Sequence, residues 1–201
     1  MCMKKSGPKN KLVVIGGPNG SGKTTLAREI LDEQDFEYIS ADDIAYEMAP
    51  DHPASVKIQA GKIFFEKLNQ AVVDQKNILI ESTLSGKSLI ALLKKFRTDY
   101  NYSISVVFIF LTNPQVCVER IAIRVKKGGH HVPTEDIYRR FGRSVVNFWD
   151  FYKELADHWH LYYTSEDFFQ EVARKQGKNK YVLDEALFVI FEKLKEKYEQ
   201  K

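Results

Sequence analysis

Cysteine is scarce in this chain of 201 residues, and the two that are present do not form a disulfide framework. Cys2 lies near the first residue, and Cys117 lies in an apolar stretch with helical spacing. Small secreted domains that depend on disulfides carry more cysteines, at regular spacings. The low cysteine content is typical of a reducing compartment, so we expect a cytoplasmic protein.

Long apolar runs are also absent. The longest, Val106–Leu111, is far shorter than the roughly 18 residues that a membrane span needs. The basic first residues are followed by a short apolar run, Leu12–Ile15, which ends in glycines and not in a cleavage-like site. We therefore expect neither a signal peptide nor contact with a membrane.

Neither sign of charge is in large excess. The chain has 30 Lys and Arg and 27 Asp and Glu, which give a formal net charge of +3. The basic residues are spread along the chain, so composition does not indicate a nucleic-acid partner. Apolar residues make up 44%, enough for a packed core. Chains usually divide only beyond about 250 residues, which predicts one domain over residues 1–201.

Short apolar runs alternate with longer stretches of helical spacing along most of the chain. The expected strands cover residues 12–15, 36–39, 77–80, 102–111 and 158–163, and the expected helices cover 24–34, 54–75, 87–96, 114–125 and 133–157. This alternation predicts an α/β fold, a parallel sheet with helices on both faces.

Glycines and a less regular final third divide this pattern further. Gly128 and Gly129 interrupt two expected helices, which predicts a helical lid over about residues 120–145 on a core of about 10–165. In the C-terminal extension, about 165–201, we expect strands at 168–172 and 180–183 around a turn, and then a helix at 184–198.

The stretch GPNGSGKT at residues 17–24 matches the phosphate-loop pattern G-x-x-x-x-G-K-[ST] in full. Its glycines let consecutive backbone N–H groups turn inward around an anion, and the following helix presents its positive end. A glycine turn that only joins strand to helix has no need of Lys23 or Thr24. We expect Lys23 to contact the β and γ phosphates of ATP and Thr24 to ligate Mg²⁺.

The pattern therefore predicts a P-loop NTPase fold with ATP and Mg²⁺ as cofactors. The expected ATP-binding residues are Gly17, Pro18, Asn19, Gly20, Ser21, Gly22, Lys23, Thr24 and Thr25.

Acidic residues follow two of the expected strands, at the sheet edge where ligands bind in open parallel sheets. Asp42 follows the strand at 36–39, and Glu81 follows the strand at 77–80. A carboxylate there can accept the proton of an attacking hydroxyl or hold Mg²⁺. Helix capping is the structural alternative for Asp42, although Asp43 is the better expected cap. The expected substrate-binding residues are Asp42, Glu81, Ser82 and Thr83, together with His130 beside the glycines of the lid.

Five of the eight arginines lie between positions 120 and 143, whereas lysine predominates elsewhere. The planar guanidinium suits bidentate binding of phosphate oxygens, so this local choice of arginine indicates an anion site. The alternative is a solvated basic face paired with acids such as Glu119 and Asp136, with Arg139 as the member least involved in a site. We expect these catalytic residues: Lys23, Asp42, Arg120, Arg124, Arg140 and Arg143.

Four stretches in this order resemble the zeta toxin family of P-loop kinases, over roughly residues 10–165. They are GGPNGSGKTT at 16–25, ISADDIA at 39–45, ESTLSG at 81–86, and the segment from Arg120 through GGHHVP to Ser144. The resemblance implies a kinase that phosphorylates the amino sugar of UDP-N-acetylglucosamine and an antitoxin protein as its partner. It also implies that Asp42 orients and deprotonates the acceptor hydroxyl, that Glu81 holds the sugar, and that Arg120 contacts the phosphates.

The sequence departs from the family pattern at two points. The second lid arginine of the family falls near His130, so Arg124, Arg140 and Arg143 remain as candidates for its role. Tyr163-Thr164-Ser165 stands where many relatives have Asp-Asn-Ser.

Two other functions stay open beside a small-molecule kinase. One is a regulatory or toxin–antitoxin module that binds ATP, hydrolyses it slowly and has no small-molecule acceptor. The other is a kinase for nucleic-acid ends, which the scattered lysines disfavour because such an enzyme needs a concentrated basic surface.

Overall fold

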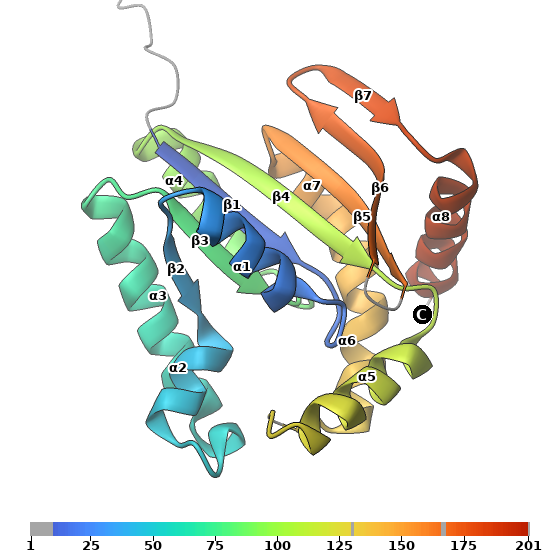
Figure 1. Ribbon diagram of the computed structural model, residues 1–201. Coiled ribbons are helices and arrows are strands. Elements are labelled where there is room, and N and C mark those ends of the chain that lie inside the picture. The colour runs from blue at the N-terminus through green and yellow to red at the C-terminus, as the bar shows by residue number, and fades with distance from the viewer. Residues whose placement is uncertain (1–9, 130, 166–167, 201) are drawn as a thin grey trace, which may run out of the picture.

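The computed structural model describes residues 10–129, 131–165 and 168–200, and these residues form a seven-stranded sheet with helices on both faces (Figure 1). The strands are β1 Asn10–Gly16, β2 Glu37–Ser40, β3 Ile78–Ser82, β4 Tyr102–Phe110, β5 His158–Ser165, β6 Phe168–Gln176 and β7 Asn179–Val182. Their spatial order is β2-β3-β1-β4-β5-β6-β7. The first five are parallel to one another, as the alternating sequence pattern predicts.

The last two strands pair antiparallel, so the sheet is mostly, and not wholly, parallel. They form a hairpin whose turn contains Gly177 at a φ of +60°, a conformation that glycine adopts without steric cost. Both strands were expected, but the expectation of a parallel sheet did not include this antiparallel extension. A two-residue turn can join only antiparallel neighbours, which accounts for the change of direction.

The helices are α1 Lys23–Glu33, α2 Ala41–Met48, α3 Lys57–Val73, α4 Ser88–Asp99, α5 Pro114–Lys126, α6 Thr134–Asn147, α7 Lys153–Leu155 and α8 Glu185–Glu199. A 3-10 turn, η1 at Pro53–Val56, precedes α3, and a π-helical segment, η2 at Phe148–Tyr152, joins α6 to α7. The expected helix at 133–157 is therefore interrupted, and α2 is the helix for which the sequence pattern offered a cap but no range. Among the described residues, none of the helices combines the length and apolar character that a membrane crossing requires.

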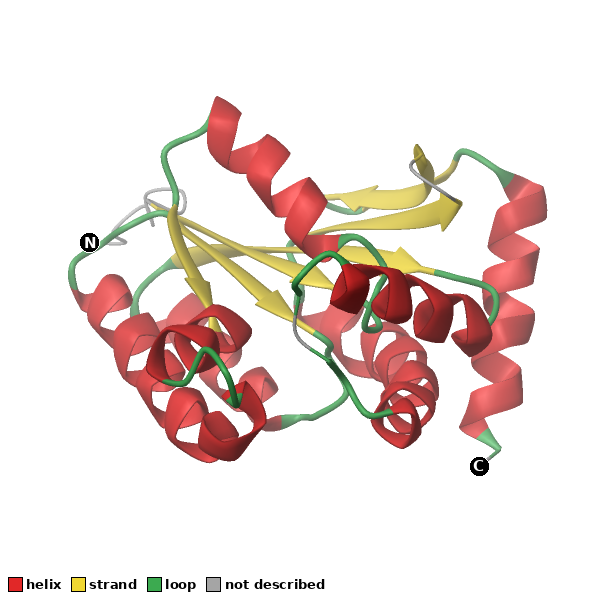
Figure 2. Cartoon of the chain, turned by 60° about the horizontal axis from the view of Figure 1, so that its bottom comes forward, coloured by secondary structure: helices red, strands yellow, loops and turns green. Residues whose placement is uncertain are grey.

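Helix α1 lies on one face of the sheet, where a small core contains Ile15, Ala27, Leu79 and Ile109 (Figure 2). The other face carries the main core, to which α3, α4, α6 and α8 contribute. There the ring of Phe108 stacks on Phe148 at a centroid distance of 4.4 Å. Central strands buried on both faces account for the unbroken apolar runs in the sequence.

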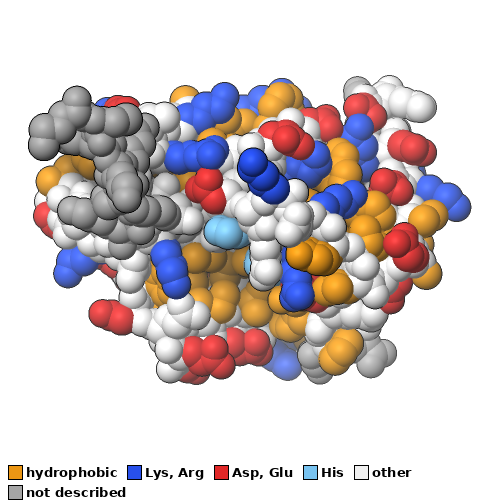
Figure 3. Space-filling view, turned by 90° about the horizontal axis from the view of Figure 1, so that it is seen from above, with side chains coloured by type: hydrophobic (Ala, Val, Ile, Leu, Met, Phe, Trp, Pro, Cys, Tyr) orange, Lys and Arg blue, Asp and Glu red, His pale blue; other side chains and the backbone are white. Residues whose placement is uncertain are grey.

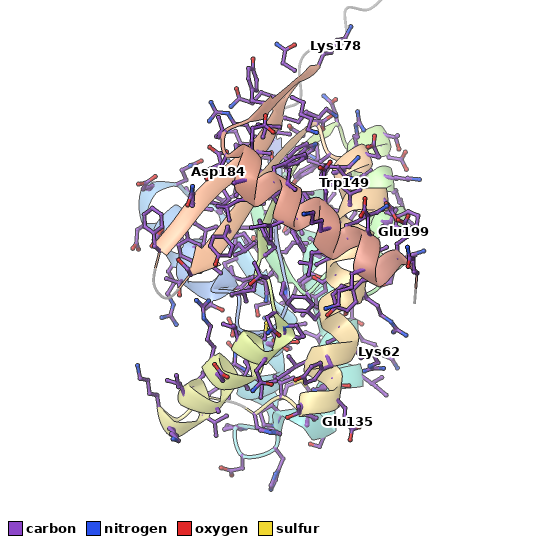
Figure 4. The ribbon with its side chains drawn as sticks, turned by 90° about the vertical axis from the view of Figure 1, so that its right-hand side faces the viewer. Lys62, Glu135, Trp149, Lys178, Asp184 and Glu199 are labelled. Carbon is purple, nitrogen blue, oxygen red and sulfur yellow. The ribbon has the colours of Figure 1, made fainter. Side chains whose placement is uncertain are left out.

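The C-terminal helix belongs to the main core, because Phe188, Phe191 and Leu194 are buried in it. Figure 4 shows Asp184 and Glu199 at the two ends of α8, with Trp149 beside the helix. The Trp149 ring lies 5.8 Å from that of Phe188. The Asp184 carboxylate caps α8 by accepting a hydrogen bond from the Leu187 amide at 2.9 Å.

The end of the molecule where β1 and β4 begin is seen in Figure 3. Acidic and basic side chains are intermixed on this face, and a recess lined by hydrophobic and histidine side chains lies near its centre. The residues predicted to be functional lie at the opposite end of the sheet, where the parallel strands finish.

Candidate active site

The loop between β1 and α1 has the conformation of an anion nest. Gly17 has a φ of +147°, and a Cβ there would lie 2.4 Å from the carbonyl oxygen of Ile109, so only glycine fits. Gly22 is the N-cap residue of α1 at a φ of +92°. Within the described residues, no side chain caps this end of α1 and its first turn contains no acid. The first N–H groups of α1 are therefore available to an anion.

Of two buried polar atoms in this loop, one supports the same interpretation. Asn19 Oδ1 and Ser21 Oγ are buried and make no hydrogen bond within the described part of the chain. Buried polar groups without a partner are rare in native proteins and need a specific explanation. A phosphate in the nest would accept a hydrogen bond from the Ser21 hydroxyl, whereas Asn19 Oδ1 is itself an acceptor and would gain no partner from an anion.

The Lys23 ammonium group lies over the loop and donates a hydrogen bond to the carbonyl oxygen of Pro18 at 2.9 Å. Burial lowers the pKa of Lys23, and the nearby carboxylates of Glu81 and Asp42 oppose that shift. Both acids expected at the strand ends therefore lie within electrostatic reach of Lys23. A bound phosphate would add further negative charge beside this ammonium group.

Glu81 links three adjacent strands at the same edge of the sheet. In the parallel register it pairs with Ile15 of β1 and Ser40 of β2. Its Oε2 accepts a hydrogen bond from the Thr24 hydroxyl at 3.1 Å, and its Oε1 accepts one from the Tyr38 hydroxyl at 2.5 Å. The Glu81 carboxylate therefore has a fixed orientation toward Thr24.

Tyr38 is a functional candidate that the sequence analysis missed. Burial and the contact with Glu81 raise the pKa of Tyr38, so it remains a hydrogen-bond donor. The available signal was its position in β2, two residues before the strand end and on the strand next to β3. That signal requires the strand order, which the sequence pattern alone does not provide.

Asp42 lies in the first turn of α2, which follows β2 without a loop. The expected capping role of Asp43 is wrong. Ser40 caps α2 instead, because its side chain accepts a hydrogen bond from the Asp43 amide at 3.3 Å. The helix begins directly at the strand end, so the last strand residue occupies the cap position and Asp42 stays at the rim of the cleft.

A cleft of about 240 Å³ brings the predicted residues of several elements together. Its lining includes Lys23, Asp42, Glu81, Ser82, Thr83 and Arg140. A second and larger hollow, of about 730 Å³, shares Asp42 with this cleft and is also lined by Tyr46, His52 and His131. Asp42 therefore stands between a site beside the P-loop and a space wide enough for a second substrate.

Helix α6 is held against the cleft by hydrogen bonds to the segment after β3. The Ser144 hydroxyl donates to the Thr83 carbonyl oxygen, and Asn147 Nδ2 donates to that of Leu84 at 2.8 Å. The hydroxyl of Tyr152 donates to the Gly86 carbonyl oxygen at 2.8 Å. These contacts fix the face of α6 that carries Arg140.

The arginines expected at the site occupy different positions. Arg120 Nη1 donates to the Gly20 carbonyl oxygen at 3.3 Å and to the Thr164 hydroxyl at 3.4 Å. Burial lowers the pKa of Arg124, and Asp42 and Glu81 oppose that shift, so Arg124 lies near both acids. Arg140 lines the cleft and pairs with Asp136 at 3.1 Å.

Two further arginines lie away from the cleft. Arg143 is exposed and is not among the described residues that line it. Arg139 is also exposed and pairs with Asp136 at 2.5 Å, consistent with its expected minor role. His130, an expected substrate-binding residue, lies outside the described residues.

Comparisons with known proteins agree with this architecture. Residues 12–140 match the family model described as an AAA domain. An uncharacterized protein of Haemophilus influenzae is 33% identical over 130 residues, which cover 65% of this chain and 91% of the relative. A cytidylate kinase of Saccharolobus islandicus is 32% identical over 84 residues, which cover 37% of this chain and only 44% of that enzyme.

Solved structures share the fold at low sequence identity. A chain in the AvrRxo1-ORF1:-ORF2 complex has a TM-score of 0.73 at 14% identity, covering 93% of this chain and 64% of that chain. A chain of the PezAT toxin-antitoxin system of Streptococcus pneumoniae has a TM-score of 0.64 at 17% identity, covering 99% of this chain and 91% of that chain. These matches establish a common architecture.

Proposed function

The chain belongs to the AAA-domain family as a P-loop kinase-like domain, and on this premise we propose that it transfers the γ-phosphate of ATP to a hydroxyl group of a small molecule. One observation carries the proposal: a single cleft contains the P-loop lysine, the carboxylates of Glu81 in β3 and Asp42 in α2, and an arginine from α6. Phosphoryl transfer requires these groups, because catalysis depends on positioning and on neutralising negative charge.

ATP would bind with its phosphates in the nest formed by residues 17–24. The N–H groups at the start of α1 and the Lys23 ammonium group would contact the β and γ phosphates. The amine of Lys23 would exchange its present contact with the Pro18 carbonyl oxygen for one with phosphate. This exchange gives the buried ammonium group an anionic partner.

The residues beside the loop fit Mg²⁺, which prefers oxygen ligands. The Thr24 hydroxyl would be the direct ligand, and the Glu81 carboxylate, 3.1 Å from that hydroxyl, would bind through water. When bound, Mg²⁺ offsets negative charge on the transferring phosphoryl group. The Tyr38 hydroxyl would keep Glu81 turned toward the metal side of the cleft. This assigns Glu81 to the metal as well as to its expected substrate role.

Asp42 would align the acceptor hydroxyl and receive its proton. It lies between the cleft with Lys23 and the larger hollow, and an acceptor in that hollow would approach the γ-phosphate past Asp42. Because phosphoryl transfer has a loose transition state, a carboxylate is a sufficient base. Arg120, Arg124 and Arg140 would stabilise charge that develops on the phosphoryl oxygens.

For the acceptor we propose a UDP-amino sugar and, for regulation, an antitoxin protein. Both rest on the resemblance of four sequence stretches to the zeta toxin family. The larger hollow supports an extended acceptor, because it adds about 730 Å³ beyond Asp42.

Transfer of label from γ-labelled ATP would test the function directly. The protein would be incubated with Mg²⁺ and a panel of UDP-sugars, nucleosides and short oligonucleotides, with Lys23→Ala as the control. We expect label on a UDP-amino sugar, and none with the variant. Label on oligonucleotide ends, with activity that falls steeply with salt, would favour the nucleic-acid kinase. ATP binding without a labelled acceptor would instead favour the regulatory module.

A further inference from the structure

Two glycines lie inside helices of the described chain, and packing accounts for only one of them. At Gly142 of α6, the ring of Tyr198 occupies the place where a Cβ would lie. At Gly61 of α3, no described atom apart from its chain neighbours and the adjacent helix backbone lies within 4 Å of a Cβ. The φ of Gly61 is not positive, so its backbone conformation does not require glycine either. Glycine weakens a helix interior, and Gly61 therefore needs another explanation.

Gly61 belongs to the wall of the cleft that contains Lys23. Phe64 and Phe65, three and four residues further along α3, lie on the same side of the helix and also line the cleft. Phe64 is buried and Phe65 is half-buried, and their rings meet edge to face at a centroid distance of 5.3 Å. The α3 wall of the cleft therefore consists of two aromatic rings and one stretch of bare backbone.

The other walls of the cleft are polar. Helices α2 and α3 lie side by side (Figures 1 and 2), and α2 contributes Asp42, while β3 contributes Glu81 and Ser82. A side chain at position 61 would take up part of a cleft of only about 240 Å³. Apolar walls with a few polar groups that fix orientation are typical of small-molecule sites. An apolar wall facing carboxylates suits a ring that carries hydroxyl groups, because its flat face and its polar edge each have a matching surface.

We propose that Gly61 determines the size of the acceptor, because its bare backbone leaves room beside Asp42 for a bulky hydroxyl-bearing group such as a sugar ring. The inference rests on the proposed function and adds a specificity-determining residue to it. A side chain at position 61 would exclude the ring and leave the phosphate nest at residues 17–24 unchanged, since Gly61 lies on a different element. Helix stability at this position is then exchanged for substrate room, as is common at functional sites.

Steady-state transfer from γ-labelled ATP to UDP-N-acetylglucosamine, together with thermal unfolding, would test this inference. The wild type would be compared with Gly61→Ala, Gly61→Leu and the matched control Lys62→Leu. Lys62 is exposed and is not among the described residues that line the cleft. We expect the KM for the acceptor to rise about five- to tenfold in Gly61→Ala and about 100-fold in Gly61→Leu, with the KM for ATP within about twofold of the wild type. Gly61→Ala should also raise the Tm by about 2–4 °C, because alanine favours the helix. Lys62→Leu should have the KM values of the wild type.

A higher Tm combined with a higher KM for the acceptor is the signature that a merely structural glycine would not produce. Two results would overturn the inference alone. One is a KM for the acceptor that stays unchanged in both Gly61 variants, and the other is an equal rise in the KM values for acceptor and ATP, which would mean that position 61 only shapes the fold. A wild-type protein that labels no acceptor would overturn the proposed function itself, and the inference with it. Gly61→Ala adds a single methyl group and keeps the test valid if Gly61→Leu does not fold.

Discussion

The two halves of the proposed active-site cleft are built in different ways. The nucleotide half is one contiguous loop followed by a helix N-terminus, and its shape depends on glycines such as Gly17 and Gly22. The acceptor half is assembled from β3, α2 and α6, which contribute Glu81, Asp42 and Arg140. Local backbone conformation therefore defines one half, whereas tertiary packing defines the other. The two halves should consequently respond differently to substitution.

The largest effect should follow from Lys23→Met, which removes the charge of the nucleotide half and keeps the side-chain length. Loss of a buried charge contact to phosphate should cost about 2–5 kcal/mol of ATP binding, and phosphate transfer should disappear with it. Calorimetric titration with MgATP would measure the loss. ATP affinity equal to that of the wild type would show that the nest binds without its lysine, contrary to this account.

In the acceptor half, Arg140→Ala should slow phosphate transfer by about 10²- to 10³-fold, because a preorganised donor to the developing charge is lost. ATP affinity should change little. Arg143→Ala, on the same helix but outside the cleft lining, is the matched control and should have no effect. The initial rate of phosphate transfer would be measured for both variants. An equal loss of rate in Arg140→Ala and Arg143→Ala would argue against the placement of α6.

Lys23→Met should also raise the free energy of unfolding of the ligand-free chain by about 0.5–2 kcal/mol. Residues at functional sites are often retained for activity at a cost in stability. Since the pKa of Lys23 is lowered in the folded chain, the folded state binds fewer protons there than the unfolded state. Wild-type stability should therefore rise relative to the variant as the pH increases toward the ordinary lysine value of 10.5. Urea unfolding of both proteins at two pH values would measure how far the free energy of unfolding of the variant exceeds that of the wild type. This excess should shrink at the higher pH, and an excess that grows with pH would refute the prediction.

The smallest effect should follow from Tyr38→Phe, which removes one hydrogen bond to Glu81. We expect the Mg²⁺ concentration for half-maximal nucleotide binding to rise about two- to tenfold, in line with the value of one hydrogen bond. Tyr181→Phe, an exposed tyrosine of β7, is the control. An unchanged Mg²⁺ requirement in Tyr38→Phe would show that Tyr38 does not act on the metal side of the cleft.

The same contrast explains what could be predicted from sequence. The strand, glycine loop and helix around residues 10–33 were expected, and the structure confirms them as β1 and α1, because their signals are contiguous. The position of Glu81 at a strand end was also expected, since an apolar run that ends in an acid marks the edge of a parallel sheet. The roles of these residues in catalysis remain predictions.

The features that were missed depend on neighbours that are distant in the sequence. Tyr38 matters because β2 lies beside β3, and Ser40 caps α2 because the strand joins the helix without a loop. The π-helical segment Phe148–Tyr152 lies where Phe148 stacks on Phe108 and Tyr152 bonds to Gly86. Periodicity in one segment contains no information on such tertiary contacts.

The Asp42→Asn variant tests the central claim most directly, because one substitution should separate the two halves. ATP affinity and the rate of phosphate transfer at saturating ATP would be measured on the same samples of wild type and variant. We predict ATP affinity within about twofold of the wild type and transfer slower by about 10²- to 10⁴-fold, as expected for loss of a general base. Unchanged transfer, or loss of ATP binding together with transfer, would contradict the account.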